Sequence, residues 1–291
     1  MNILPSHGRA DHAPVTLRCD AFEENHDTRF YFASKRHAHA VGSLQRFVEE
    51  RRPGFAVLTG EVGCGKTITR AVLQELLVHK GCLVVEVENS MLDFDGLLLE
   101  IISQVRNCRV NPTTLPDRYA RLVEFKNALS ECVIEKDSYL VLILDEAQQL
   151  SPDTLEGLRA LTNIVAERIH FMSVILLGQP ELNLTLDAMR AVKSRIDTQV
   201  HLEPLEPAEM LRYLVHRMGF AGLQVSPPFT VDSLSMLGRL SEGVPRDINR
   251  ICRGALDVAV EERLVWLDAN LVHRIAMRSV SDAPLAQLDV N

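Results

Sequence analysis

The residues Gly60 to Thr67 read GEVGCGKT, and this spacing is typical of a loop that binds the phosphates of a nucleotide. The pattern is G-x-x-x-x-G-K-[ST], in which consecutive backbone N–H groups, freed by glycines, wrap around the α- and β-phosphates. Lys66 can reach the β- and γ-phosphate oxygens, and the Thr67 hydroxyl can hold Mg²⁺. We expect the whole loop to contact ATP, through Gly60, Glu61, Val62, Gly63, Cys64, Gly65, Lys66 and Thr67.

A pair of carboxylates, Asp145-Glu146, follows the apolar run Leu140 to Leu144. A carboxylate at the carboxyl end of a buried strand can hold Mg²⁺ through water, opposite Thr67. Glu146 is then placed to polarise the water that attacks the γ-phosphate. The pair could also be an exposed acidic turn, but the phosphate loop upstream favours the catalytic interpretation.

Two polar residues follow other predicted strands. Gln179, in the run Gly178-Gln179-Pro180-Glu181, could orient the attacking water, or it could be a plain turn residue. Asn89 follows the second strand and could hydrogen-bond Glu146 and gate it, which is the weaker of the two hypotheses.

Arginines supply the remaining candidates for stabilising the charge on the γ-phosphate. Arg246 follows Gly-Val-Pro and opens a helix from which a guanidinium could reach the nucleotide. Arg195, before the last strand, could enter the site of a neighbouring subunit, with Arg190 as the alternative. A solvated or ion-paired side chain is the usual state of any single arginine. Arg246, Arg250 and Arg253 could also be a basic stripe on one helix face.

The elements that must position these residues alternate between strands and helices. Apolar runs predict strands at 55–59, 83–87, 139–144, 170–177 and 198–202, with helices at 36–51, 68–80, 92–106, 117–135 and 152–168 between them. Such alternation predicts a doubly wound, parallel α/β sheet with helices on both faces. From Glu206 only helices are predicted, at 207–219, 229–241, 245–262 and 268–278.

The predicted organisation is therefore a flexible arm over 1–20, a nucleotide-binding core over 21–205, a helical lid domain over 206–280 and a loose tail over 281–291.

The chain has 291 residues, 46% of them hydrophobic, which is ordinary for a soluble globular protein. No apolar run approaches the ~18 residues of a membrane span, and no secretory signal is visible. The six cysteines show no metal-binding spacing, so we expect a cytoplasmic protein with reduced thiols.

Weaker signals lie near the N-terminus. His37 and His39 would point to different faces of a helix and make a poor metal pair, so we expect surface histidines. Tyr31-Phe32 could cover an adenine, although core packing is the simpler interpretation. The formal net charge of −8 weighs against a dominant nucleic-acid surface.

These motifs, in this order, resemble those of the AAA+ ATPases. The motifs that carry the resemblance are GEVGCGKT, LVLILDEAQQL, GQPEL, SRI and GVPRDINRIC. The resemblance is closer to the ExeA/GspA-type secretion ATPases and the related exopolysaccharide-export ATPases, over roughly residues 21–278, and it includes DTRFYFAS at 27–34. The TniB/TnsC-type transposition ATPases share many of these motifs, including DEAQ.

The resemblance implies a P-loop fold with a three-layer αβα core, a small all-helical lid, and ATP bound at the interfaces of a ring or filament. By similarity, Gly60 to Thr67 would be Walker A and Asp145-Glu146 Walker B, with Gln179 at sensor 1, Arg195 as the arginine finger and Arg246 at sensor 2. Secretion members usually continue into a membrane helix and a peptidoglycan-binding domain. Neither is found in these residues, which argues against a cell-wall role.

We therefore expect a Mg²⁺-dependent, oligomeric ATPase that remodels or regulates a partner assembly of a secretion or export system. The alternative from another class is an ATP-dependent regulator of a transposase that binds duplex DNA, like TniB and TnsC. A nucleotide-gated scaffold, whose output is protein docking alone, is a third hypothesis.

Overall fold

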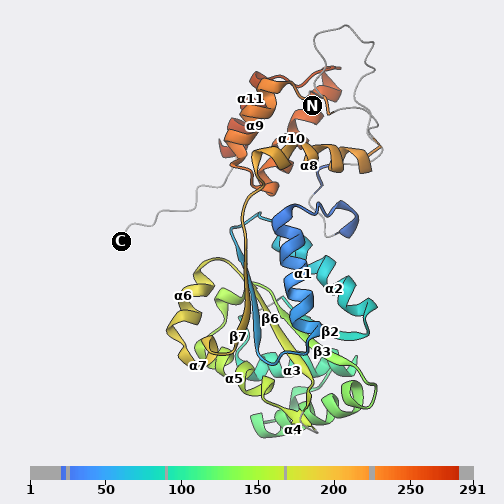
Figure 1. The fold of residues 1–291 in the computed structure, drawn as a ribbon, viewed down its shortest axis with the longest axis vertical. Coiled ribbons are helices and arrows are strands. Elements are labelled where there is room, and N and C mark those ends of the chain that lie inside the picture. Colours follow the sequence, from blue (N-terminus) through green and yellow to red (C-terminus); the bar gives the residue numbers. More distant parts are fainter. Residues whose placement is uncertain (1–20, 24–26, 89–90, 167–168, 223–226, 282–291) are drawn as a thin grey trace. The chain divides into compact units, whose positions relative to one another are not determined.

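The computed structural model describes residues 21–23, 27–88, 91–166, 169–222 and 227–281. They divide into two compact units (Figure 1). One unit, His26–Glu203, contains the sheet, and the other joins the N-terminal segment up to Asn25 with the helices from Pro204 onward. The predicted arm over 1–20 and, beyond Ser281, the predicted tail lie outside the described residues.

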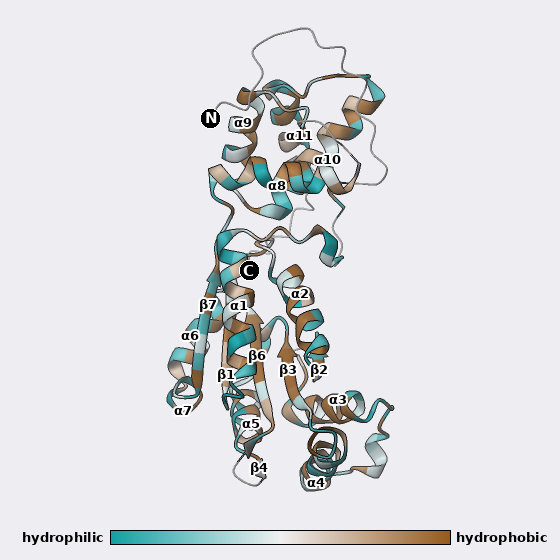
Figure 2. Cartoon of the chain, turned by 45° about the vertical axis from the view of Figure 1, so that its right-hand side comes forward, coloured by the Kyte–Doolittle hydropathy of each residue, from teal (hydrophilic) through white to brown (hydrophobic). Residues whose placement is uncertain are grey.

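Five parallel strands form the sheet of the first unit, in the order β2-β3-β6-β1-β7. They are β1 (Phe55–Gly60), β2 (Cys82–Val87), β3 (Tyr139–Leu144), β6 (Met172–Gly178) and β7 (Ile196–Leu202). Every residue of β1, β3 and β6 is buried, and these central strands carry strongly hydrophobic colours in Figure 2. A strand covered on both faces needs an almost continuous apolar run, which is why these segments were recognisable in the sequence.

Helices cover both faces of this sheet. On one face α1 (Lys35–Glu49) and α2 (Lys66–His79) pack against the alternate strand residues that include Ala56, Leu58 and Ile143. On the other face lie α3 (Phe94–Arg106), α4 (Arg118–Leu129), α5 (Pro152–Thr162), α6 (Glu181–Ala188) and α7 (Arg190–Lys193). The predicted three-layer α/β architecture is confirmed.

Four of these helices start at the polar residues that the sequence places before them. The side chains of Ser34, Asp93, Asp117 and Ser151 each accept a hydrogen bond from the backbone N–H three residues further on. Such N-caps satisfy one of the unpaired donors of the first helical turn and are worth about 1 kcal/mol each.

Some predicted elements are wrong. The helix predicted over 152–168 ends at Thr162, and a short antiparallel pair of strands follows, β4 (Val165–Ala166) and β5 (Ile169–His170). The run Thr-Asn-Ile-Val, with its β-branched residues and asparagine, has low helix propensity. The helix predicted over 117–135 is α4 followed by a π-helical turn, Ser130–Ile134. The helices α6 and α7 were not predicted.

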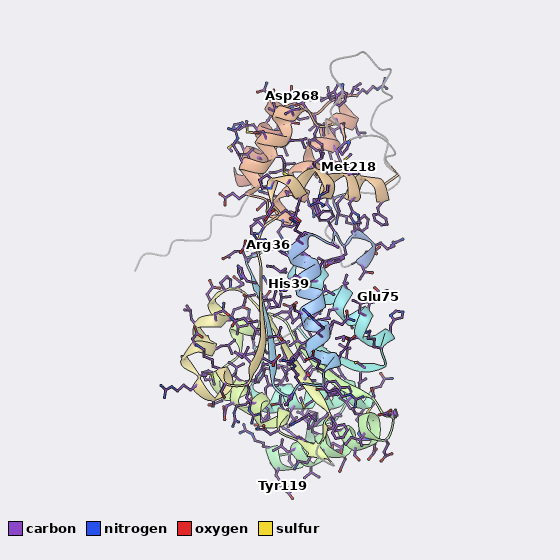
Figure 3. All side chains as sticks on the ribbon, in the orientation of Figure 1. Arg36, His39, Glu75, Tyr119, Met218 and Asp268 are labelled. Atoms are coloured by element: carbon purple, nitrogen blue, oxygen red, sulfur yellow. The ribbon has the colours of Figure 1, made fainter. Side chains whose placement is uncertain are left out.

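The second unit is built from α8 (Pro207–Phe220), α9 (Val231–Ser241), α10 (Pro245–Glu261) and α11 (Ala269–Ser281). Their bounds lie close to the predicted ones, because each helix buries one stripe of apolar residues at helical spacing. On α10 that stripe includes Ile248, Ile251 and Ala255. Met218 of α8 is also buried, and it is labelled in Figure 3.

The segment Ala21–Glu23 is bound to this helical unit by two arginines. Arg217 is buried and donates to the carbonyl oxygens of Ala21 (2.7 Å) and Glu23 (2.8 Å). Arg253 donates to the Phe22 carbonyl oxygen at 2.9 Å, and the Phe22 side chain is fully buried. The sequence analysis placed these residues at the start of the core; their contacts are instead with α8 and α10.

No helix among the described ranges combines the length and the apolar composition that crossing a membrane requires.

The packing of α5 against α3 predicts the effect of one substitution. A Cβ added at Gly157 would lie 2.3 Å from Cδ2 and 2.7 Å from Cγ of the Phe94 ring. Gly157→Ala should therefore lower the free energy of unfolding of the core by about 1–2 kcal/mol, since overpacking outweighs the gain in helix propensity. Gly42→Ala is the matched control. No atom lies within 4 Å of its added Cβ, so it should stabilise α1 by about 0.5–1 kcal/mol. Urea unfolding measures both, and equal midpoints would contradict this packing.

Candidate nucleotide site

The carboxyl ends of three adjacent strands bring the sequence-predicted residues together. The phosphate loop follows β1, Asp145-Glu146 follows β3, and Gln179 follows β6, which lies between β1 and β3 in the sheet. Parallel strands end at the same edge, and Thr59 of β1 pairs with Gly178 of β6. The crevice at the carboxyl ends of a parallel sheet is the general ligand site of open α/β folds.

The phosphate loop owes its conformation to two glycines. Gly63 and Gly65 have φ angles of +85° and +94°, in the left-handed region that residues with a Cβ avoid. Gly65 is also the N-cap of α2, and no side chain caps this helix. A helix N-terminus that starts from a glycine-rich loop offers backbone N–H groups and a positive dipole to an anion.

Lys66 is buried within its own loop. Its Nζ donates to the carbonyl oxygens of Gly60 (2.6 Å) and Glu61 (3.1 Å). Burial lowers the pKa of Lys66, and the negative charge of Glu146 is the largest of the opposing influences. An ammonium held in a partly desolvated loop, near the carboxylates after β3, is well placed to bind phosphate oxygens.

His37 of α1 is buried against the phosphate loop, which corrects the expectation of a surface histidine. The ring is buried, and its Nε2 lies 3.0 Å from the Cys64 carbonyl oxygen. Its Nδ1 lies 2.7 Å from the Ser34 hydroxyl, so both ring nitrogens have partners. The contact is close enough that a Cβ at Gly65 would lie 2.7 Å from Nε2. His39 is exposed on the same helix (Figure 3), so the two histidines do face different ways.

The turn after β3 has an unusual backbone. Glu146 has φ +50° and ψ +37°, the left-handed conformation, and begins a short 3₁₀ turn over Ala147–Gln149. Its N–H donates to Asp145 Oδ1 at 2.9 Å. A non-glycine residue in this region costs of order 1–3 kcal/mol, and such positions concentrate at functional sites.

Arg70 is a neighbour of this turn that the sequence analysis missed. Its buried side chain donates to Glu86 of β2 at 2.6 Å, and its Nε lies 3.6 Å from Asp145 Oδ2. Arg70 is four residues after Lys66 on α2, so helical spacing places it on the same face. That spacing is the signal by which it could have been found.

Gln148 was also missed, although it is part of the DEAQ sequence. Its Nε2 donates to Glu146 Oε2 at 2.6 Å, and its Oε1 accepts the backbone N–H of Gln179 at 3.1 Å. One side chain thus connects the residue after β3 with the residue after β6.

The other predicted residues lie elsewhere. Arg195 is exposed, and its carbonyl oxygen accepts the N–H of Phe55 at the start of β1, whereas the phosphate loop follows the end of that strand. Arg190 is exposed at the start of α7. Arg246 is exposed in the first turn of α10, in the helical unit. Asn89 lies outside the described residues.

The residues at the three strand ends fit a triphosphate with its metal. The loop glycines give the backbone its anion-binding shape, and Lys66 supplies a cation. Thr67 and Asp145 supply the hydroxyl and carboxylate oxygens that Mg²⁺ prefers, and Mg²⁺ usually takes its other ligands from phosphates and water.

Comparison with known proteins shows which proteins this chain is similar to. Residues 49–186 match the model of a family described as AAA domain. The chain is 34% identical over 245 residues to General secretion pathway protein A of Aeromonas hydrophila, a match that covers 82% of this chain and 43% of the relative. Residues 49–186 of this chain are an AAA domain. The expected resemblance to the ExeA/GspA-type secretion ATPases is confirmed, and the chain spans less than half the length of that relative.

Solved structures of other proteins share the fold of this chain. Cdc6p from Pyrobaculum aerophilum superposes with a TM-score of 0.65 at 20% identity, over 83% of this chain and 68% of that one. The ORC2 protein of Aeropyrum pernix gives a TM-score of 0.63 at 20% identity, over 92% and 72%. At this identity the likeness shows the fold alone.

The loop geometry predicts that the thiol of Cys64 reacts slowly. Cys64 is fully buried, and burial raises the pKa of its thiol, whereas Cys108 is exposed. Since the thiolate is the reacting form, maleimide should label Cys64 at least about tenfold more slowly than Cys108 in the folded protein, and equally fast in urea. Peptide mass spectrometry over a time course measures both. Equal labelling without urea would show that the loop is open to solvent.

Proposed function

We propose that this protein is an AAA ATPase that binds and hydrolyses Mg²⁺–ATP as an oligomer, and that it remodels or regulates a partner assembly of a secretion or export system. The observation that carries the proposal is the meeting of the phosphate loop, Asp145-Glu146 and Gln179 at the carboxyl ends of β1, β3 and β6. These are the parts that phosphoryl transfer to water requires: a phosphate cradle, a metal-binding carboxylate and a base.

Each residue then has a distinct task. The loop residues from Gly60 to Thr67 hold the phosphates, and Lys66 exchanges its carbonyl partners for β- and γ-oxygens. Thr67 and Asp145 would hold Mg²⁺, which would neutralise phosphate charge when bound. Glu146 accepts a proton from the attacking water, and Gln179 helps to orient that water.

Two arginines complete the proposed mechanism from outside the strand ends. Arg195 lies near the beginning of β1, and the six residues of the strand, about 20 Å at 3.3 Å each, separate it from the phosphate loop of its own chain. A catalytic role for Arg195 is therefore a role in a neighbour's site. Arg246 of the helical unit would contact the γ-phosphate as a sensor of the bound nucleotide.

The biological setting rests on the General secretion pathway protein A relative, whose name places it in secretion. The alternative, a DNA-binding regulator like TniB and TnsC, uses the same ATP site and differs in its partner. The net charge of −8 weighs against a broad DNA-binding surface.

Two substitutions separate binding from turnover. Lys66→Ala should weaken ATP binding by about 10- to 100-fold, because it removes charge-assisted hydrogen bonds. Glu146→Gln should leave ATP binding close to wild type and lower kcat by about 10²- to 10⁴-fold, because it removes the general base. Titration with a fluorescent ATP analogue and a phosphate-release assay measure the two effects, with Lys80→Ala at the far end of α2 as the control for Lys66. Wild-type turnover by Glu146→Gln would reject the assignment.

Mixing two inactive variants tests whether Arg195 acts in a neighbouring site. Arg195→Ala should lower kcat by about 10³-fold, as expected for an arginine finger. Mixed with Lys66→Ala it should recover part of the wild-type rate, because a mixed interface combines one intact loop with one intact arginine.

The control mixture replaces Lys66→Ala by the double variant Lys66→Ala/Arg195→Ala, which supplies no arginine and should stay inactive. Recovery in the control as well, or full activity of Arg195→Ala alone, would exclude the trans role. The same mixtures with Arg190→Ala decide between the two arginines.

A further inference from the structure

Glu146 and Gln179 are joined through the amide of a single side chain. The Gln148 Nε2–H donates to Glu146 Oε2 at 2.6 Å, and the Gln148 Oε1 accepts the Gln179 backbone N–H at 3.1 Å. The amide orientation follows from the partners, since the backbone N–H can only donate and a carboxylate accepts. Gln148 therefore uses both ends of its amide in this connection.

The surrounding backbone is shaped for this contact. The left-handed conformation of Glu146 starts the tight turn over Ala147–Gln149, and the turn brings residue 148 back towards residue 146. At the other end, a Cβ at Gly178 would lie 2.8 Å from Gln148 Oε1 and 3.3 Å from the Gln148 backbone nitrogen. The close approach of the two loops thus depends on a glycine at position 178.

We propose that Gln148 is a positioning residue for ATP hydrolysis: it fixes the carboxylate of Glu146 and couples its orientation to the loop that carries Gln179. The inference rests on the proposed role of Glu146 as the general base. With Oε2 held by the amide, the carboxylate is restrained in one orientation, and its other oxygen would accept the proton of the attacking water. A base that is held in its reactive orientation needs no reorganisation at the moment of reaction.

The strand order places the Gln179 end of this connection beside the phosphate loop. Gln179 follows β6, the strand between the phosphate loop of β1 and the carboxylates of β3. A shift of the Gln179 backbone on γ-phosphate contact is passed to Glu146 by the Gln148 amide. The state of the nucleotide and the orientation of the base are therefore linked through one hydrogen-bonded side chain.

Two variants of Gln148 separate its two hydrogen bonds. In Gln148→Met the side chain keeps a similar size but loses both hydrogen bonds, to Glu146 and to the Gln179 N–H. In Gln148→Glu an acceptor for the Gln179 N–H is kept, but the donor to Glu146 is replaced by a second carboxylate. Both should bind ATP within about twofold of wild type and lower kcat at least tenfold. In Gln148→Glu, the acid limb of the kcat–pH profile should also move to higher pH, because two carboxylates at hydrogen-bond distance resist ionising together. Lys66, whose charge interacts with that of Glu146, and the adjacent Asp145 are unchanged in this variant.

The same turn supplies a control residue, and the loop after β6 supplies a second way to break the contact. Gln149 is the adjacent glutamine and is exposed, so Gln149→Met and Gln149→Glu should leave kcat and the pH profile unchanged. Gly178→Ala leaves both glutamine and glutamate in place but forces Gln148 away from the β6 loop, and it should lower kcat with ATP binding retained.

A double variant distinguishes positioning from general structural support. If Gln148 acts through Glu146, adding Gln148→Met to Glu146→Gln should slow turnover by less than twofold further, since effects within one catalytic unit do not add. Wild-type kcat and pH profile in Gln148→Met, or additive losses in the double variant, would overturn the inference while leaving the role of Glu146 intact. Wild-type turnover in Glu146→Gln would instead overturn the proposed function itself.

Discussion

The parallel pairing of β3, β6 and β1 is the constraint on which the site depends. Because parallel strands end at the same edge of a sheet, residues 60–67, 145–146 and 179 meet although more than 110 positions separate the first from the last. Every residue of these three strands is buried, and alternate side chains pack into two different cores on the two faces of the sheet. A slip of one residue would exchange the side chains of the two cores and disrupt the packing of both, so the cores fix the register. The hydrophobic core therefore sets the geometry of the charged site.

Around that edge, polar side chains fix the loops that the strands deliver. The buried ring of His37 contacts the Cys64 carbonyl oxygen and so restrains the backbone of the phosphate loop. Arg70 connects the carboxylates of β2 and β3, and Gln148 connects the loops after β3 and β6. In each case a side chain on one element restrains the backbone or carboxylate of another. Preorganisation of this kind lets the site stabilise developing charge without rearrangement.

The sequence alone was sufficient for the elements with strong local signals. Continuous apolar runs identified the central strands, and the motif spacing predicted that residues 60–67 would follow β1 and that Asp145-Glu146 would follow β3. The helices of the C-terminal unit were also predictable, because their apolar stripes have helical spacing. These features depend on neighbours in sequence, which a pattern can show.

What the sequence did not reveal depends on contacts between distant elements. Whether His37 is exposed or buried is decided by the loop 27 residues further along, and the role of the Gln148 amide is decided by the loop after β6. The end of α5 at Thr162 and the short helices α6 and α7 were missed because their local patterns are weak. Ala21–Glu23 were assigned to the core because nothing local shows that Arg217 and Arg253 bind their carbonyls.

The central claim is that a triphosphate and its metal bind where β1, β6 and β3 end. The most direct measurement is a crystal structure of the protein with Mg²⁺ and a non-hydrolysable ATP analogue. We expect the phosphates to lie in the loop Gly60–Thr67 and the metal to lie between Thr67 and Asp145. The Lys66 Nζ should have moved from the Gly60 carbonyl to the β- and γ-oxygens. An analogue bound at saturating concentration anywhere else, with the Lys66 contacts to Gly60 and Glu61 unchanged, would contradict it.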